Sequence, residues 1–221
     1  MVYMESKAYF VYTVIILIWR YEDMKEIFEK IWETALPYQD QRNDDGHARV
    51  TLKYAKELVK LEDGNEDIVI PAIILHDVGY SQILRERRML IFDKDATNEE
   101  REAVRYIHQA QSVKLGEKIL KELNYPADMI PEILEIISKH DTRKGFISKE
   151  EGLVRDADKL WRYSSESFKV NAKLRKSVLE ERLKRLEKDL EVTDYIYSES
   201  AKKIARQELE ERKKLIESAK E

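Results

Sequence analysis

Apolar residues recur every three or four positions along most of this chain, which is the spacing of one face of an α-helix. The spacing predicts amphipathic helices over residues 24–36, 47–61, 97–123, 128–140 and 148–161. Helix-breaking residues fall between these segments, among them Pro37, Gly64 and Pro126. No segment alternates apolar and polar residues as a half-buried strand does, so the pattern predicts an all-α fold.

The run from Ile68 to Leu75 is almost wholly apolar and is interrupted only by Pro71. A buried strand and a buried helix look alike over so short a run. Proline is tolerated in the first turn of a helix and is damaging in a central strand, which favours a buried helix that begins near Asp67. Gly79 is then expected to cap the C-terminal end of this helix.

Two segments have the sequence of a capping box, in which the first and fourth residues bond each other's backbone N–H groups. The boxes pair Thr97 with Glu100, and Ser148 with Glu151. Beyond residue 164 the chain becomes highly charged, and residues 170–191 and 193–220 are expected to form two long helices. No Gly/Ser linker precedes them, so residues 165–221 are expected to pack on the same domain as residues 24–164.

Residues 1–23 contain an apolar run of 12 residues, 8–19. A membrane-spanning helix needs roughly 17–25 residues. The segment also lacks the positive start and small-residue cleavage site of a signal peptide. We therefore expect no membrane partner and a cytoplasmic location, with the run docked on the core or on a partner chain. The alternative is that the natural protein begins at Met24 and residues 1–23 are not native.

Composition supports this interpretation and excludes several classes of function. Only 6 of the 221 residues are Gly and 4 are Pro, which favours long helices with short connections. The net charge of −4 gives no reason to expect a nucleic-acid polymer as partner. The chain has no cysteine, which excludes disulfides, thiolate metal sites and a cysteine nucleophile. Any metal must therefore be bound by histidine, carboxylate, carbonyl or water.

The candidate chemistry centres on the four histidines of the chain, which are His47, His76, His108 and His140. Each is expected on the apolar face of a different helix. One such histidine is usually a hydrogen-bonded core residue, but four that face inward need partners, and a shared metal ion satisfies several at once. Asp77 directly follows His76, and Asp158 lies on another amphipathic helix, where an unpaired charge would be costly.

The order His47, then His76-Asp77, then Asp158 resembles the HD-domain superfamily of metal-dependent phosphohydrolases. Three segments carry the resemblance: DGHARV at 45–50, VIPAIILHDVGY at 69–80 and DADKL at 156–160. It covers roughly residues 24–164 and favours Asp158 over Asp156 as the last ligand. The resemblance implies an all-α HD-domain helical bundle, to which this chain adds two C-terminal helices.

The resemblance also implies a mechanism, in which His47, His76, Asp77 and Asp158 hold a divalent metal ion that activates a water to attack phosphorus. Some family members hold two ions, which would place His108 and His140 on the second ion and make Asp77 the shared, catalytic carboxylate. The alternative is that His108 and His140 bind substrate phosphate or support the other ligands. The expected ion is Mn, Fe, Co, Ni, Zn or Mg.

The expected substrate is a nucleotide or another small phosphorylated molecule, cleaved at a phosphoester or phosphoanhydride bond. Lys139, Arg143 and Lys144 are candidate phosphate contacts, although such cations are most often solvated. The GYP tripeptide of cyclic-di-GMP phosphodiesterases of this fold is missing, and so is the acidic pair of alarmone hydrolases. Tyr80 stands where many family members have lysine.

Two other functions stay open at this point. The first is a di-iron oxygenase, because inositol-oxygenase-like enzymes resemble this chain in having the same set of six ligands on the same fold. Such an enzyme would differ from a phosphohydrolase in needing iron. The chain could instead be a non-enzymatic interaction module with a structural metal and a charged C-terminal surface. The sequence leaves open the substrate, the native metal and whether the chain forms a homo-oligomer.

Overall fold

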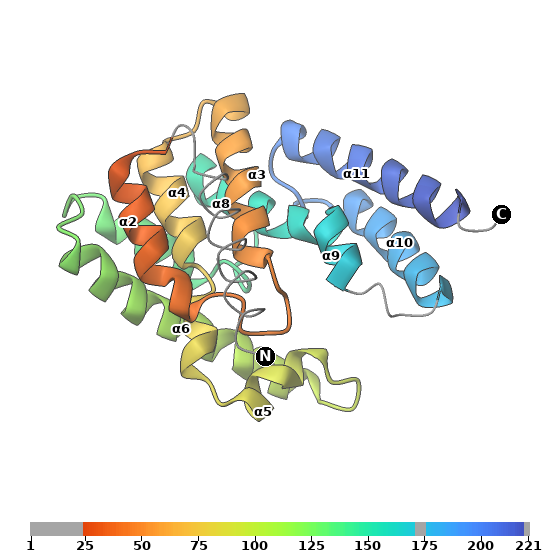
Figure 1. Ribbon diagram of the computed structural model, residues 1–221, viewed down its shortest axis with the longest axis horizontal. Helices are drawn as coiled ribbons and strands as arrows, with labels where there is room; N and C mark the ends of the chain where they lie inside the picture. The colour runs from red at the N-terminus through yellow and green to blue at the C-terminus, as the bar shows by residue number, and fades with distance from the viewer. Residues whose placement is uncertain (1–23, 171–175, 219–221) are drawn as a thin grey trace, which may run out of the picture.

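The computed structural model of the protein describes residues 24–170 and 176–218 (Figure 1). The expected apolar docking segment in residues 1–23 lies outside these described residues. The α-helices are α2 (Glu26–Ala35), α3 (His47–Glu62), α4 (Glu66–Leu75), α5 (Arg85–Arg88), α6 (Asn98–Glu122), α7 (Ile130–Ser138), α8 (Lys149–Leu160), α9 (Ser165–Val170), α10 (Lys176–Glu191) and α11 (Glu199–Ser218). Short 3₁₀ helices are η1 (Leu36–Tyr38), η2 (Val78–Gln82), η3 (Met89–Phe92) and η4 (Trp161–Tyr163).

The described part of the chain contains no strand, so the predicted all-α fold is confirmed. Within the same residues, no helix combines the length and the apolar composition needed to cross a bilayer.

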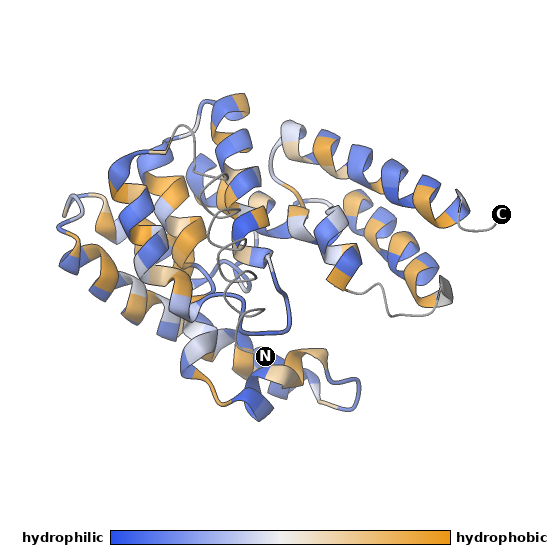
Figure 2. Cartoon of the chain, viewed as in Figure 1, coloured by the Kyte–Doolittle hydropathy of each residue, from blue (hydrophilic) through white to orange (hydrophobic). Residues whose placement is uncertain are grey.

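Helix α4 is the centre of the fold and packs against α2, α3, α7 and α8. Its residues from Ile68 to Leu75 are all buried. A helix with one covered face needs only an apolar stripe, whereas a helix covered on all sides is apolar all round. Figure 2 shows this difference, because α4 is mostly orange while α3 and α6 carry both colours. The predicted buried helix is therefore confirmed.

Pro71 lies in the second turn of α4 and not in its first turn. Because proline has no N–H, it cannot donate a hydrogen bond to the carbonyl of Asp67 four residues earlier. The hydroxyl of Tyr125 donates to that carbonyl instead, at 2.6 Å. The proline is tolerated because a side chain from the loop before α7 satisfies the backbone oxygen that it leaves free.

The expectation that Gly79 caps α4 is wrong. His76 directly follows the helix, and Gly79 lies within η2, where its N–H donates to the hydroxyl of Ser112 at 2.9 Å. A Cβ on Gly79 would lie 2.1 Å from the carbonyl oxygen of His108. Glycine is needed here because η2 packs directly against the backbone of α6, and this contact brings the end of α4 next to His108.

One of the two predicted capping boxes is complete and the other is half formed. The Thr97 hydroxyl accepts from the N–H of Glu100, and the Glu100 carboxylate accepts from the N–H of Thr97. Ser148 accepts from the N–H of Glu151 at 3.1 Å. The carboxylate of Glu151 turns to the guanidinium of Arg155 at 2.9 Å, because a buried acid needs a charged partner.

The C-terminal helices α10 and α11 lie side by side, and α11 packs on α3 and α8 (Figure 1). Their inward residues join the same apolar core as α4, and they include Leu183, Leu186, Ala201, Ala205 and Leu209. Helix α11 begins at Glu199 and not at residue 193, and residues 165–170 form the separate short helix α9. Residues 171–175 and 219–220 of the expected helices lie outside the described part of the chain. The predicted boundary at residue 164, between the metal-binding domain and the C-terminal helices, stays a prediction.

Asp156 fixes the start of α11. Its carboxylate, which is buried, accepts from the N–H of Tyr197 at 2.7 Å and from the N–H and hydroxyl of Ser198 at 2.8 Å each. The two aspartates of the DADKL segment therefore have different surroundings. Asp156 faces the C-terminal helices, and Asp158 faces the histidines.

We predict that Asp156→Ala lowers the free energy of unfolding by about 1–3 kcal/mol, because it leaves buried N–H groups unpaired. Urea unfolding of the metal-free protein, followed by far-UV circular dichroism, measures this change. The matched control is Asp128→Ala at an exposed site, which should change stability by less than about 0.5 kcal/mol. An unchanged midpoint for Asp156→Ala would contradict the anchoring role.

Candidate metal centre

The four histidines come together from four segments of the chain. His47 opens α3, His76 follows α4, His108 lies inside α6, and His140 follows α7. All four side chains are buried. They form two pairs: the Nε2 atoms of His47 and His76 are 3.2 Å apart, and those of His108 and His140 are 3.3 Å apart.

The carboxylate of Asp77 lies between the two pairs. Its Oδ2 atom is 3.3 Å from Nε2 of His47 and 3.4 Å from Nε2 of His76. Its Oδ1 atom is 3.5 Å from Nε2 of His108 and 3.4 Å from Nε2 of His140. Asp77 therefore belongs to two groups of ligand atoms, and the atoms of each group all lie within 4.8 Å of one another.

Asp158 approaches the first pair from α8. Its Oδ1 atom is 3.4 Å from Nε2 of His47 and 3.6 Å from Nε2 of His76. The structure thus brings together all six residues that the sequence proposes as ligands. We use the name first group for His47, His76, Asp77 and Asp158, and the name second group for Asp77, His108 and His140.

The hydrogen bonds of the imidazole rings show that the residues fit a cation. Three Nδ1 atoms donate to backbone carbonyls: His76 to Ile73 at 2.7 Å, His108 to Val104 at 3.3 Å and His140 to Ile137 at 2.9 Å. A carbonyl only accepts, so Nδ1 carries the proton and Nε2 of a neutral ring directs a lone pair into the cluster. Facing lone pairs repel each other unless a cation lies between them, and metal-binding histidines are usually oriented in this way.

The separations between ligand atoms also fit a divalent ion. A nitrogen or oxygen ligand lies about 2.0–2.2 Å from zinc, which puts neighbouring ligands of a tetrahedral site about 3.3–3.6 Å apart. Each group has separations between 3.2 and 3.6 Å. The ligands are nitrogen and carboxylate oxygen, a set that suits several first-row divalent metals.

The charges in the cluster are strongly coupled. Burial lowers the pKa of His76, but the carboxylates of Asp77 and Asp158 outweigh burial and raise this pKa well above its ordinary value. Burial raises the pKa of Asp77, but Arg42 and His76 outweigh it and hold this pKa well below the usual range. His108 differs, because burial lowers its pKa to about 4. In the metal-free protein these surroundings therefore favour the charged form of His76 and the neutral form of His108.

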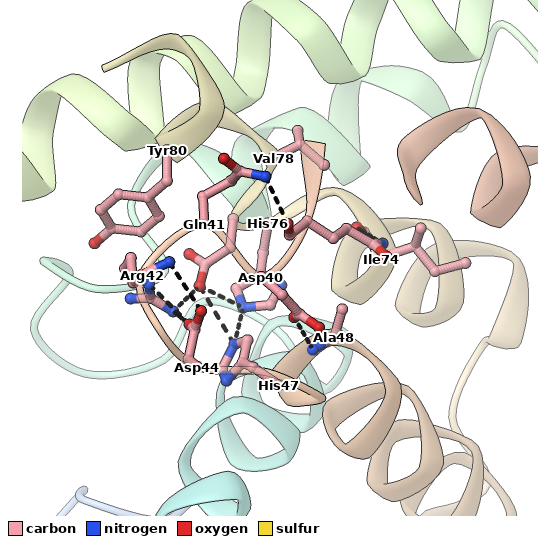
Figure 3. Close-up of a pocket in the computed structure, with 12 residues that line it drawn as sticks. Asp40, Gln41, Arg42, Asp44, His47, Ala48, Ile74, His76, Val78 and Tyr80 are labelled. Carbon is pink, nitrogen blue, oxygen red and sulfur yellow. Dashed lines mark hydrogen bonds and ion pairs between the residues drawn. The ribbon is translucent and has the colours of Figure 1, made fainter. Parts of the chain in front are cut away.

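Arg42 is a residue of this site that the sequence analysis missed. Its guanidinium pairs with Oδ2 of Asp77 and, at 2.9 Å, with Oδ2 of Asp44. It also lies over the ring of Tyr80, 4.2 Å from the ring centroid, as Figure 3 shows. Tyr80 in turn stacks on His108, with ring centroids 4.0 Å apart. No sequence signal marks Arg42, because it is one of 40 basic residues and lies in a polar loop.

The loop that carries Arg42 is held by Asp40. The Asp40 carboxylate accepts from the N–H of Gly46 at 2.8 Å and from the N–H of Ala48 at 2.9 Å. Gly46, at φ +89°, has the left-handed backbone that glycine adopts without strain. These contacts fix the loop to the start of α3, at the residues on either side of His47.

The candidate phosphate contacts proposed from the sequence lie after α7. Arg143 pairs with Glu135, and its Nε atom is 3.7 Å from Glu151. The structure therefore ties Arg143 to α7 and α8 and does not bring it among the ligand atoms. Lys139 and Lys144 are both exposed. Their role in substrate binding stays a prediction.

The fold and the site together define an all-α protein with a buried histidine–aspartate centre for divalent metal. The family model of the HD domain matches residues 45–163, a segment that includes all six proposed ligands. The chain therefore belongs to the HD domain family, whose members are commonly metal-dependent hydrolases. No curated protein and no solved structure matches the chain significantly.

We predict that the protein binds two divalent ions per chain, because the ligand atoms form two groups. Elemental analysis of protein purified without a metal-chelating tag measures the content. His108→Ala should retain one ion, and Asp77→Ala should retain none because both groups share this carboxylate. Glu102→Ala, at an exposed site on α6, is the matched control and should retain both. A wild-type protein that binds only one ion, and keeps it in His108→Ala, would reduce the centre to the first group.

Metal binding should also release protons. A metal ion on Nε2 of His76 must displace the proton that the raised pKa places there, so affinity should fall as pH falls. Titration calorimetry at about neutral pH, in buffers with different ionisation enthalpies, measures the number of protons released. His76→Ala should release fewer protons than the wild type. An enthalpy that does not depend on the buffer would contradict this charge state.

Proposed function

We propose that this protein is a metal-dependent phosphohydrolase that cleaves a phosphoester or phosphoanhydride of a nucleotide or another small phosphorylated molecule. The observation that carries the proposal is the position of Asp77, whose two oxygens face two separate pairs of buried histidines. Bound divalent ions supply stabilisation of charge on phosphate oxygens and lower the pKa of a water molecule.

The protein's own residues hold the reacting groups in place. Backbone carbonyls fix the rings of His76, His108 and His140, so that their Nε2 atoms face the carboxylate of Asp77. The ring of Trp161 meets His47 edge-on, with ring centroids 5.3 Å apart. These contacts leave the imidazoles little freedom, and a rigid ligand set keeps its geometry during reaction.

Arg42 is positioned to bind the substrate phosphate. Oδ2 of Asp77 faces His47, His76 and the Arg42 guanidinium, so a metal ion bound by this oxygen would lie close to Arg42. Asp44 and the Tyr80 ring would still hold the guanidinium beside the centre. An arginine held in this way presents fixed donors that match the oxygens of phosphate. Lys139, Arg143 and Lys144 stay as candidates for contacts farther from the centre.

The same proposal assigns a small phosphorylated molecule as partner. The net charge of −4 does not favour a nucleic-acid polymer. The proposal includes the cytoplasmic location that the sequence predicts. The mass of the protein in solution would show whether two copies of the chain assemble.

We predict that the protein loaded with Mn²⁺, Co²⁺ or Zn²⁺ releases inorganic phosphate or pyrophosphate from at least one compound in a panel of nucleotides and sugar phosphates. Asp77→Ala should lower kcat/KM by more than about 10³-fold, because metal ions contribute several kcal/mol to catalysis. Arg42→Gln should lower it by about 10–100-fold, the value of one charge-assisted hydrogen bond. Arg85→Gln, at an exposed site, should leave it unchanged.

Lack of phosphate release with every metal would contradict the proposal. Oxygen consumption that requires iron would instead support the di-iron alternative, since the two functions share a ligand set and differ in the metal that they need. Stoichiometric metal without either reaction would support the structural role. An Arg42→Gln variant with wild-type kcat/KM would remove Arg42 from the phosphate site and leave the rest of the proposal intact.

A further inference from the structure

A third carboxylate lies beside the second group of ligand atoms. It belongs to Asp141, which directly follows His140. Its Oδ2 atom is 3.5 Å from Nε2 of His108 and 3.9 Å from Nε2 of His140. The side chain is 21% exposed, so the carboxylate lies at the edge of the cluster, partly covered by it. Asp141 is not among the six ligands that the HD resemblance implies.

Asp141 relates to the second group as Asp158 relates to the first. In the first group, Oδ1 of Asp158 is 3.4 and 3.6 Å from two imidazole nitrogens that also face Oδ2 of Asp77. In the second group, Asp141 faces two imidazole nitrogens that also face Oδ1 of Asp77. With Asp141 included, each group consists of two imidazoles, one oxygen of the shared carboxylate and one carboxylate of its own.

Gln109 on α6 holds Asp141 in this position. Its buried Oε1 atom accepts from the N–H of Asp141 at 3.1 Å and from the hydroxyl of Thr142 at 3.2 Å. Its Nε2 atom donates to the carbonyl of Arg105 at 3.0 Å, which fixes the amide. Two neighbouring residues of α6, His108 and Gln109, thus contact the histidine and the aspartate that follow α7.

The surroundings of the Asp141 carboxylate favour a bound cation. Among the described residues, its ion pairs within 4.0 Å are with His108 and His140. The Nδ1 protons of both rings are used on backbone carbonyls, so the Nε2 atoms near Asp141 face it as lone pairs when the rings are neutral. A largely buried carboxylate opposite two lone pairs is unfavourable without a positive charge between them.

We propose that Asp141 is a ligand of the second metal ion, so that each ion is held by two histidines, Asp77 and one carboxylate of its own. The inference rests on the two-ion centre of the proposed function and adds a seventh ligand to it. Because the two groups then have the same composition and charge, two ions of one metal should bind with affinities of the same order. A second ion held by Asp77 and histidines alone would bind more weakly than the first.

The test is the zinc affinity of the full chain, measured by competition with a coloured chelator. Wild-type protein should bind two Zn²⁺ ions with affinities within about tenfold of each other. Asp141→Asn, which keeps the shape and removes the charge, should weaken one ion by at least about 100-fold, because loss of an outer partner alone costs about 10–100-fold. Glu132→Gln removes an exposed charge from α7 and should change neither affinity.

A crystal structure of the zinc-loaded protein separates a ligand from a residue that acts at a distance. A carboxylate oxygen of Asp141 should lie about 2.0–2.2 Å from the second ion. Asp141→Glu, which keeps a carboxylate, should lose less affinity than Asp141→Asn and serves as the second variant if the latter does not fold. A wild type that binds one ion, or an Asp141→Asn variant with two wild-type affinities, overturns the proposal.

These measurements need no substrate, so they fail independently of the phosphohydrolase proposal. Two tight ions that depend on Asp141, in a protein that hydrolyses no phosphorylated compound, would retain the ligand and reject the reaction. Hydrolysis by a protein whose Asp141→Asn variant binds zinc normally would retain the reaction and reject Asp141 as a ligand.

Discussion

The carboxylate of Asp77 lies between two pairs of buried imidazoles, and much of the surrounding structure serves to keep it there. The apolar helix α4 ends just before His76 and Asp77 and is held on all sides by other helices. The Tyr125 hydroxyl compensates the carbonyl that Pro71 leaves free within that helix. The charge of Asp77 is balanced by Arg42 and His76. Helix α4 thus lies at the centre of the hydrophobic core and also positions His76 and Asp77 in the metal centre.

Much of this arrangement could be predicted from the sequence, because the relevant signals are local. Apolar periodicity locates the core helices, since the apolar residues of a helix with one covered face recur every three or four positions. The histidine and aspartate ligands lie in short motifs with a recognisable context, and the structure brings those six residues together. The capping box at Thr97 was predictable for the same reason, because both of its partners lie within one turn.

The parts that the sequence did not reveal depend on tertiary contacts. Arg42 reaches Asp77 from a polar loop, and nothing in its neighbours distinguishes it from other basic residues. The orientation of Asp141 depends on Gln109, which is 32 residues away in the chain. The role expected for Gly79 was wrong because a cap and a close backbone contact both require glycine. Helix α11 begins later than expected because its start is fixed by the contacts of Asp156 with Tyr197 and Ser198, which are distant in the sequence.

Gly79 also acts as a spacer between the two halves of the centre. The backbone at Gly79 lies directly against the backbone of α6, and its N–H donates to the hydroxyl of Ser112. His76 and Asp77 lie on one side of this contact, and His108 lies on the other. The close approach of these two main chains therefore places His76 and Asp77 next to His108. A larger side chain at residue 79 would push η2 away from α6, and with it one histidine pair away from the other.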